Sequence, residues 1–327
     1  MEFAIQAAGL GKRYGDHQAL AGVNLQVRTG SVLGLLGHNG AGKTTTVRLL
    51  ATLLEPTSGH AMVAGYDVVK QPREVRSRIG LAGQYAAVDE LLTGRENLAL
   101  LGTLLRLGRR AARSRAEELL AAFDLEEAAD RPAGTYSGGM RRRLDLAACL
   151  IASPTVLFLD EPTTGLDPAS RMTLWQMVRE QVRQGVTVLL TTQYLEEADF
   201  LADRITVFDK GQVRAEGTPE ELKRSVGDER LEVSVATQDD LARALYALGP
   251  VAHATPRPSE DRHALSVTLT DRLGTISAVA STLRTSGVQV LDFALQKPSL
   301  DDVFFHLTQQ SNSTHQQQAP QPEGVRA

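Results

Sequence analysis

Cysteine is nearly absent from this sequence, since Cys149 is the only one among 327 residues. A single cysteine excludes an intramolecular disulfide and is typical of a chain in a reducing compartment. Cys149 lies within the apolar run Leu146–Ile151. We therefore interpret it as a small core residue and not as a reactive thiol.

Long apolar runs are also missing. The best candidate, Ile151–Leu159, is interrupted by Ser153 and Pro154, so it is too short to span a bilayer. The first residues lack a basic segment followed by an apolar one, and this pattern predicts no signal peptide. We expect a cytosolic chain that acts at a membrane only through a partner.

The sequence has no excess of positive charge. Its formal net charge is -4, which gives no reason to expect nucleic acid as a partner. Hydrophobic residues at 42% and charged residues at 23% are ordinary for a globular protein. The length predicts one large domain or two modest ones.

The most informative stretch is a glycine-rich loop. The apolar run Ser31–Leu36 precedes it and reads as a buried strand, while apolar residues at helical spacing follow in Thr46–Ala51. A strand, a glycine-rich loop and a helix start together favour phosphate binding, because backbone N–H groups and the helix dipole attract an anion. The alternative, a glycine-rich turn that matches by chance, does not explain this context. The predicted binding residues are Gly37, His38, Asn39, Gly40, Ala41, Gly42, Lys43, Thr44 and Thr45.

Two residues of this loop have predicted chemical roles. Lys43 would reach the terminal phosphates of a nucleoside triphosphate as a point charge. The Thr44 hydroxyl would ligate Mg²⁺. The loop alone therefore predicts the ligand and not what is done with it.

A second glycine motif, Ser137-Gly138-Gly139, leads directly into a helical stretch. Backbone N–H groups and a helix dipole can meet phosphate here as well. The alternative is an N-cap serine followed by flexible glycines, which is common. We expect the adjoining run, Arg141–Arg143, to form a solvated helix face and not a nucleic-acid patch.

Two carboxylates follow the apolar run Val156–Leu159. On a buried parallel strand, Asp160 and Glu161 would lie at the carboxyl end, where open α/β sheets bind ligands. Asp160 would hold Mg²⁺ directly or through water. Glu161 would accept a proton from the attacking water or orient it.

Strands and helices alternate along most of the chain, which predicts an α/β fold with a largely parallel sheet. A capping box at Thr93–Glu96 opens a block of helices between two strand-rich regions. Beyond Ser225–Asp228, strands and helices alternate again as a small α+β unit with no catalytic constellation. The predicted limits are 1–227 for a P-loop domain with a helical subdomain at about 86–150, 228–308 for the α+β domain, and 309–327 for a disordered tail.

Taken in order, these motifs resemble those of the ATP-binding-cassette (ABC) ATPases over about the first two thirds of the chain. The matching segments are Gly37–Thr45 to Walker A, Ser137–Gly139 to the signature, Val156–Glu161 to Walker B with the catalytic glutamate, and Gly165–Asp167 to the D-loop. Two single residues also match, Gln84 the Q-loop glutamine and Tyr14 the aromatic that stacks on adenine. The resemblance implies that ATP and Mg²⁺ are the cofactors and that Gln84 binds both of them.

Two departures from the family pattern stand out. Met140 occupies the position where the signature has glutamine, and Gln193 the position of the switch histidine. Glutamine donates an N–H to a γ-phosphate but cannot titrate. Our hypothesis is that Gln193 senses the γ-phosphate, Glu161 is the principal base and Lys43 supplies positive charge.

A narrower resemblance rests on Thr191–Asp199 and Pro298–Phe304. These segments look like the daunorubicin/doxorubicin-resistance type of ATP-binding subunit, which powers efflux of drugs or lipid-like products through a separate membrane subunit. The resemblance implies a homodimer with two shared ATP sites, bound peripherally to the cytoplasmic face of the membrane, with Asp89–Leu105 facing the permease. A soluble ATP switch of the same fold and an importer ATPase with a regulatory C-terminal domain are the alternatives.

Overall fold

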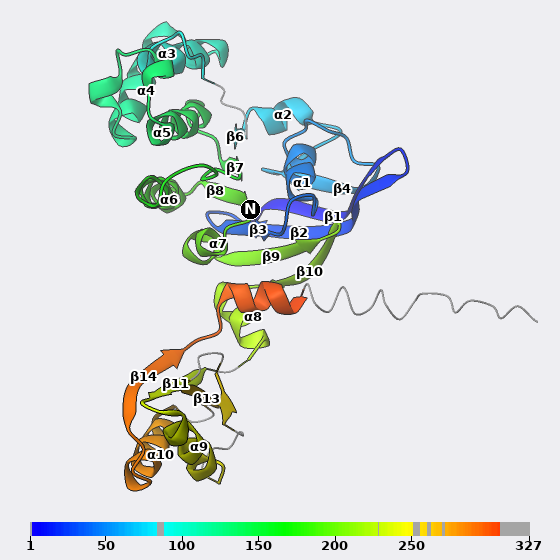
Figure 1. Cartoon of the computed structure of the whole chain (residues 1–327). Helices are drawn as coiled ribbons and strands as arrows, with labels where there is room; N and C mark the ends of the chain where they lie inside the picture. Colours follow the sequence, from blue (N-terminus) through cyan, green and yellow to red (C-terminus); the bar gives the residue numbers. More distant parts are fainter. Residues whose placement is uncertain are drawn as a thin grey trace, which may run out of the picture. The chain divides into compact units, whose positions relative to one another are not determined.

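The computed structural model describes residues 2–83, 88–227, 229–250, 256–259, 263–269 and 272–307 (Figure 1). Residues 1–219 form the first of two compact units. Gln84 and the tail from 308 onward lie outside the described residues. No helix in the described part of the chain combines the length and the apolar character needed to cross a bilayer.

A six-stranded sheet, in the order β10-β9-β3-β8-β7-β6, forms the centre of the first unit. Its strands are β3 (Val32–Leu36), β6 (Ile79–Ala82), β7 (Val156–Asp160), β8 (Thr187–Thr192), β9 (Arg204–Asp209) and β10 (Gln212–Gly217). All neighbours are parallel except β10, which runs antiparallel to β9. Every residue of β3, β7 and β8 is buried, as expected for parallel strands that are covered on both faces.

The register of this sheet aligns the strand ends that matter for function. Leu36 of β3 pairs with Thr192 of β8, and Asp160 of β7 pairs with Thr191 of β8. Because the three strands are parallel, their carboxyl ends lie side by side at one edge of the sheet. The sheet therefore presents the loops after β3, β7 and β8 together.

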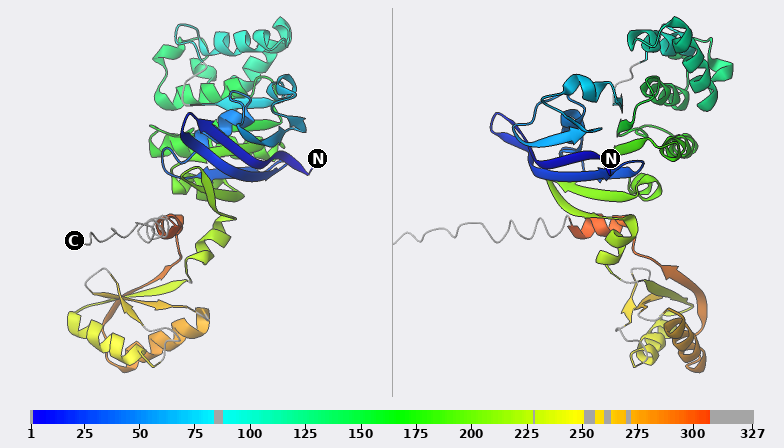
Figure 2. Two further views of the ribbon diagram at one scale, coloured as in Figure 1. Left: turned by 90° about the vertical axis from the view of Figure 1, so that its right-hand side faces the viewer. Right: turned by 180° about the vertical axis from the view of Figure 1, so that it is seen from behind.

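A second, antiparallel sheet has the order β2-β1-β4-β5 (Figure 2). Its strands are β1 (Phe3–Tyr14), β2 (His17–Arg28), β4 (Ser58–Val63) and β5 (Tyr66–Asp67). β1 and β2 are each 12 residues long. Register shifts along the β1–β2 pair break the alternation of buried and exposed residues, so periodicity alone could not reveal continuous strands. Tyr14 is the last residue of β1.

Helix α1 (Lys43–Leu50) follows β3, and α2 (Pro72–Arg76) precedes β6. Between β6 and β7 the chain forms α3 (Gly94–Leu104), α4 (Arg109–Ala122), two short 3₁₀ turns and α5 (Gly138–Cys149). Figures 1 and 2 show α3, α4 and α5 gathered at the end of the unit that is remote from β9 and β10. This arrangement confirms the predicted inserted helical subdomain, and α6 (Pro168–Arg183) and α7 (Leu195–Leu201) complete the unit.

The capping box at the start of α3 is confirmed. The Thr93 hydroxyl accepts a hydrogen bond from the Glu96 amide at 3.1 Å, and the Glu96 carboxylate accepts one from the Thr93 amide at 2.9 Å. Both bonds satisfy amides that the helix itself leaves free. The start of α3 is therefore fixed by residues that the sequence alone identifies.

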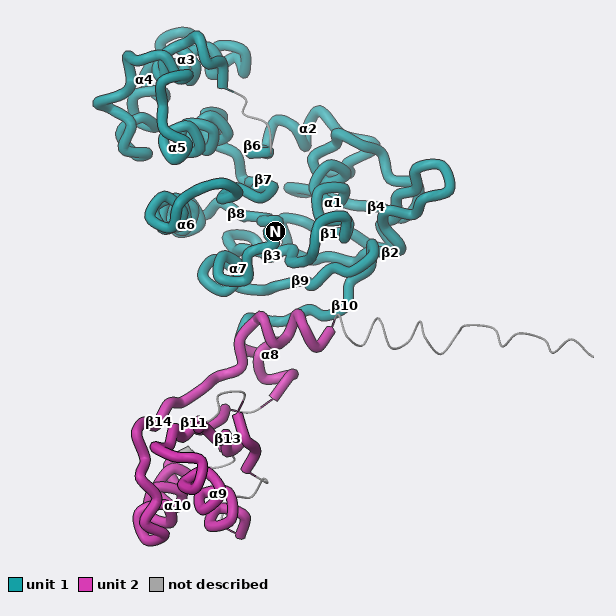
Figure 3. The backbone as a smooth tube through the Cα atoms, viewed as in Figure 1, with its two compact units in different colours: residues 1–219 teal, residues 220–327 magenta. Residues whose placement is uncertain are grey.

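The second compact unit comprises residues 220–327 (Figure 3). Its antiparallel sheet, β12-β13-β11-β14, contains β11 (Arg230–Val235), β12 (Arg257–Pro258), β13 (Ala264–Thr268) and β14 (Val290–Gln296). Helices α8 (Pro219–Ser225), α9 (Gln238–Leu248), α10 (Arg272–Thr285) and a helix at 300–307 accompany it. Apolar residues of β11, β13, α9 and α10 form one buried cluster, which confirms the predicted small α+β domain.

Candidate functional site

The glycine-rich loop joins β3 to α1 at the carboxyl edge of the six-stranded sheet. Gly42, which precedes α1, has a φ of 107°. A Cβ at this position would lie 2.6 Å from the Leu20 side chain and 3.0 Å from the Ala19 carbonyl. Glycine is therefore required here, both for the backbone conformation and for the close approach of β2.

His38 ties the loop to the neighbouring strand β9. Its Nε2 lies 3.0 Å from Asp209 Oδ1, and its Nδ1 lies 2.7 Å from the Asn39 carbonyl oxygen. Asp209 is itself buried at the end of β9. These contacts hold the first turn of the loop against the sheet.

A cavity of about 350 Å³ opens at the loop, a volume in the range of small-molecule sites. It is lined by Tyr14, His17, Ala19, Asn39, Gly40, Ala41, Gly42, Lys43, Thr44, Thr45 and Glu161. The structure thus brings Tyr14, the loop and Glu161 together from β1, the β3–α1 connection and the end of β7. His17 and Ala19 were not identified from the sequence, because their place in the lining depends on how β2 passes the loop.

Lys43 points into the first turn of the loop. Its ammonium donates to the carbonyls of Gly37 at 2.6 Å and His38 at 3.1 Å, and lies 3.7 Å from Glu161 Oε1. Burial lowers the pKa of Lys43, while the carboxylates of Glu161 and Asp160 oppose this shift. The loop therefore holds a positive charge close to both acidic residues.

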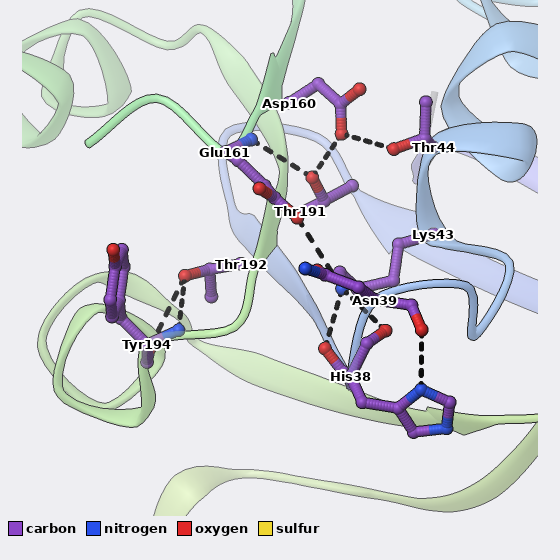
Figure 4. A network of polar contacts seen from close by, with 10 residues as sticks. His38, Asn39, Lys43, Thr44, Asp160, Glu161, Thr191, Thr192 and Tyr194 are labelled. Atoms are coloured by element: carbon purple, nitrogen blue, oxygen red, sulfur yellow. Dashed lines mark hydrogen bonds and ion pairs between the residues drawn. The ribbon is translucent and has the colours of Figure 1, made fainter. Parts of the chain in front are cut away.

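Asp160 is joined to two threonine hydroxyls (Figure 4). Its Oδ1 accepts hydrogen bonds from Thr191 at 2.5 Å and from Thr44 at 3.1 Å. A carboxylate beside a hydroxyl is the hard oxygen set that Mg²⁺ prefers, so Thr44 and Asp160 fit such an ion. Thr191 was given no role in the site from the sequence, where it appears only as the first residue of the segment Thr191–Asp199.

Glu161 has a backbone conformation that is rare outside glycine, with a φ of 52°. Such a left-handed residue costs about 1 kcal/mol and persists where neighbouring contacts fix it. The Glu161 amide donates to two atoms of Thr191, the carbonyl oxygen and Oγ1, each at 3.1 Å. In Figure 4 the turned backbone directs the Glu161 side chain toward Lys43, whereas Asp160 points toward Thr44.

The prediction that Arg141–Arg143 form a solvated helix face is wrong. All three side chains are half-buried and bonded to other segments. Arg142 donates to the carbonyls of Gly83 and Glu161, each at 3.0 Å, and to that of Pro162. A helical charge run looks solvated in the sequence because nothing local reveals that loop carbonyls lie within reach of the guanidinium groups.

The two neighbouring arginines are anchored elsewhere. Arg141 pairs with Glu90 at 2.8 Å, and Arg143 bonds the Phe123 carbonyl at 3.0 Å and the Asp124 carboxylate at 2.7 Å. Both partners of Arg143 follow α4. The run therefore fastens α5 to several parts of the first unit.

Ser137 caps α5, since its hydroxyl accepts a hydrogen bond from the Met140 amide at 3.2 Å. Ser137 and Gly138 are exposed. Neither Ser137 nor Gly139 lines the 350 Å³ cavity at the glycine-rich loop Gly37–Thr45, which we call the phosphate loop below. Ser137 and Gly139 line a separate cavity of about 200 Å³ beside α6. Within one chain the structure does not bring the two glycine motifs together.

Three further residues considered in the sequence are Gln193, Gln84 and Cys149. Gln193 follows β8 with an exposed side chain and does not line the 350 Å³ cavity. Gln84 lies outside the described residues. Burial raises the pKa of the half-buried Cys149 thiol to about 12, which keeps it protonated and agrees with the expected unreactive residue.

A buried carboxyl group that the sequence analysis missed lies behind the end of β8. Glu197 of α7 is fully buried, and its Oε1 accepts a hydrogen bond from Trp175 Nε1 at 2.9 Å. Burial raises the pKa of Glu197, and hydrogen bonds to the carboxyl group oppose the shift. The one available signal was its helical spacing, because Glu197 shares its buried face with Ala198 and Leu201.

Comparison with known proteins identifies the family. A family model described as ABC transporter matches residues 20–164, and one described as ATP-binding protein DrrA1-3-like, C-terminal domain, matches residues 217–308. The chain is 56% identical to daunorubicin resistance ATP-binding protein DrrA2 of Streptomyces coeruleorubidus, over 94% of this chain and 95% of that one. It is 50% identical to the daunorubicin/doxorubicin resistance ATP-binding protein DrrA of Streptomyces peucetius, with 93% and 92% coverage. It is 37% identical to the Nod factor export ATP-binding protein I of Ralstonia nicotianae, with 93% of each chain covered.

Solved structures with a similar fold are ATP-binding cassettes. A nucleotide-free cassette from an ABC transporter matches with a TM-score of 0.63 and 26% identity, over 68% of this chain and 94% of that one. A dimeric cassette in a post-hydrolysis state, bound to ADP and Pi, matches with a TM-score of 0.60 and 27% identity, over 65% and 98%. These likenesses confirm the predicted P-loop ATPase fold of the first unit.

The buried Glu197 carboxyl predicts a specific pH dependence of stability. Because its folded-state pKa is raised above the ordinary 4.5, the native protein retains a proton that the unfolded chain releases. Stability should therefore fall as the pH rises from 4.5 through the raised value, by up to about 1.4 kcal/mol per pH unit. Glu197→Gln should lack this decline, because glutamine keeps the acceptor for Trp175 without titrating. Urea unfolding at a series of pH values measures the difference.

The control for this measurement is Glu196→Gln, which alters an exposed carboxylate on the same helix. It should follow the wild-type pH dependence. Parallel stability curves for the wild type and Glu197→Gln would contradict the prediction.

Proposed function

The chain belongs to the ABC transporter family and is an ATP-hydrolysing, ATP-binding subunit, and we propose that it powers efflux of a drug-like or lipid-like compound through a separate membrane subunit. The observation that carries the ATP-dependent part of this proposal is the convergence of the phosphate loop, Asp160 and Glu161 at the carboxyl edge of the sheet. Similarity to drug-resistance ATP-binding proteins extends over 94% of the chain, including the C-terminal domain. That extent favours export over a soluble ATP switch or an importer ATPase.

The residues of the cavity have distinct proposed roles. Tyr14, which is 44% exposed at the cavity rim, stacks on the base, and the loop amides bind the phosphates. Lys43 bonds the terminal phosphates in place of the Gly37 and His38 carbonyls. The full proposed set for ATP is Tyr14, Gly37–Thr45 and Gln84, with Ser137, Gly138 and Gly139 of a second chain.

Mg²⁺ is the proposed metal, held by Thr44 and Asp160 with Gln84. When bound, it supplies positive charge to the phosphate oxygens. Glu161 orients the attacking water or takes its proton, and its Oε1 lies 3.7 Å from the Lys43 ammonium. Gln193 contacts the γ-phosphate through its side-chain amide, a role that needs movement of the loop after β8 when ATP binds.

A homodimer completes the site. The chain has one phosphate loop and one signature, and Ser137 and Gly139 line a cavity separate from that of the loop. We propose a head-to-tail dimer in which the signature of each chain covers the ATP bound to the other. ATP then closes the dimer and hydrolysis opens it, because the γ-phosphate is the bridging group.

The inserted helices carry a surface suited to the membrane subunit. Leu91 is 87% exposed, and Leu100, Leu104 and Leu105 on and after α3 are 47%, 68% and 51% exposed. Exposed apolar patches of this kind mark interaction sites. We propose that 89–105 binds the permease and holds the chain peripherally at the cytoplasmic face of the membrane. Residues 228–308 steady the dimer or this contact.

Glu161→Gln tests the proposed base. It keeps the size of the side chain but removes the carboxylate, so ATP hydrolysis should fall by about 100-fold or more while nucleotide binding persists. In MgATP the variant should accumulate as a dimer, since closed sites no longer turn over. Steady-state ATPase assays and light scattering measure the two effects.

The exposed Glu196→Gln serves as a control and should retain wild-type activity. A Glu161→Gln protein that hydrolyses ATP at more than about half the wild-type rate would contradict the assignment of the base. A protein that stays monomeric in MgATP would contradict dimer closure by the chain alone.

Leu104→Glu tests the proposed permease surface. A charge on this exposed leucine should abolish recovery of a multispanning protein when the chain is affinity-purified from detergent-solubilised native membranes with MgATP. Leu53→Glu, at another exposed leucine in the same unit, should leave recovery unchanged. Both purified variants should keep their ATPase activity, because neither residue lines the cavity at the phosphate loop. Equal recovery of the partner with both variants would refute this docking surface.

A further inference from the structure

The backbone of Glu161 is held from two sides. Its amide donates to Thr191 of β8, and its carbonyl accepts from Arg142 of α5 at 3.0 Å. The left-handed φ of 52° makes this residue dependent on such contacts, because an L side chain is crowded in that conformation. Loss of either contact would free the backbone that aims the carboxylate.

Arg142 contacts more than Glu161. Its guanidinium also donates to the carbonyl of Gly83, at the end of β6, and to that of Pro162. One side chain therefore joins α5, the helix that begins in the signature Ser137–Gly139, to the segments that follow β6 and β7. The planar guanidinium spreads its donors over three nitrogen atoms in a fixed fork, whereas a lysine ammonium places all its donors on one atom and lacks that reach.

Helix α5 connects Arg142 rigidly to the signature. Ser137 caps the helix, and the Arg141 amide donates to the Ser137 carbonyl at 2.8 Å, which closes the first turn. Arg142 lies one turn beyond Gly138 and Gly139. A shift of the helix start is therefore transmitted directly to the guanidinium.

We propose that Arg142 is a positioning residue that sets the backbone of Glu161 and thereby couples the signature helix to hydrolysis in the same chain. The inference rests on the proposed function, in which that signature covers the ATP bound to the second chain. Engagement of the partner's nucleotide by Ser137 and Gly139 then orients Glu161 at the chain's own nucleotide. The two shared sites of the dimer are linked through α5.

The test compares Arg142→Gln, Arg142→Lys and Arg143→Gln in the full-length chain. Arg143 is the matched control, because it lies on the same helix and bonds two carbonyls and a carboxylate near α4, away from Glu161. Arg142→Gln should lower kcat for ATP by about 30- to 100-fold, since small misplacement of a catalytic group has effects of that size. The KM should change by less than about twofold, because Tyr14 and the loop residues that we propose bind ATP are not contacted by Arg142.

A second measurement separates positioning from loss of fold. The double variant with Arg142→Gln and Glu161→Gln should form the MgATP-dependent dimer at the same ATP concentration as Glu161→Gln alone. Arg142→Lys should remain at least about tenfold impaired despite its charge, and Arg143→Gln should stay within about twofold of the wild type.

Three results would overturn the inference. They are an Arg142→Gln enzyme with wild-type kcat, full rescue by Arg142→Lys, and loss of the dimer in the double variant, which would assign Arg142 a structural role. An inactive wild-type chain would instead contradict the proposed function itself, so the two failures are distinguishable.

Discussion

The parallel alignment of β3, β8 and β7 is the constraint on which the site depends. These strands are buried along their whole length, so their register is fixed by packing on both faces. The register brings the phosphate loop, Thr191 and Asp160 to one edge of the sheet. Hydrogen bonds from Thr44 and Thr191 to one oxygen of Asp160 then tie the start of α1 to the ends of β7 and β8.

A second constraint, the backbone conformation after β7, points two adjacent carboxylates in different directions. Asp160 ends β7 in regular strand geometry, whereas Glu161 turns into the left-handed region. The turn points Asp160 toward the hydroxyl of Thr44 and Glu161 toward the ammonium of Lys43 (Figure 4). The two neighbouring carboxylates thus take separate positions, which suit the metal binding and water activation that we propose for them, and the strain at Glu161 is offset by hydrogen bonds from Arg142 and to Thr191.

The features that could be predicted from the sequence are those that depend on residues close together in the chain. The phosphate loop, the capping box at Thr93 and the apolar strand before Asp160 depend on residues close in the chain, and the predictions for them agree with the structure. Confirmation of the fold and the family rests on the same ordered motifs together with the comparisons.

The features that could not be predicted depend on distant contacts. Arg142 reads as solvated until the carbonyls of Gly83 and Glu161 are known to lie beside it, and the continuity of β1 and β2 is hidden by bulges. Glu197 becomes a buried acid only through the packing of Trp175 against α7. The roles of individual site residues stay predictions, since they concern a nucleotide-bound state of two chains.

The most direct measurement is therefore a structure of the Glu161→Gln chain determined with MgATP. The account predicts a head-to-tail dimer in which each nucleotide lies between the phosphate loop of one chain and Ser137 and Gly139 of the other, with Mg²⁺ against Thr44 and Asp160. Nucleotide bound to a single chain, with the signature turned away from the γ-phosphate, would contradict it.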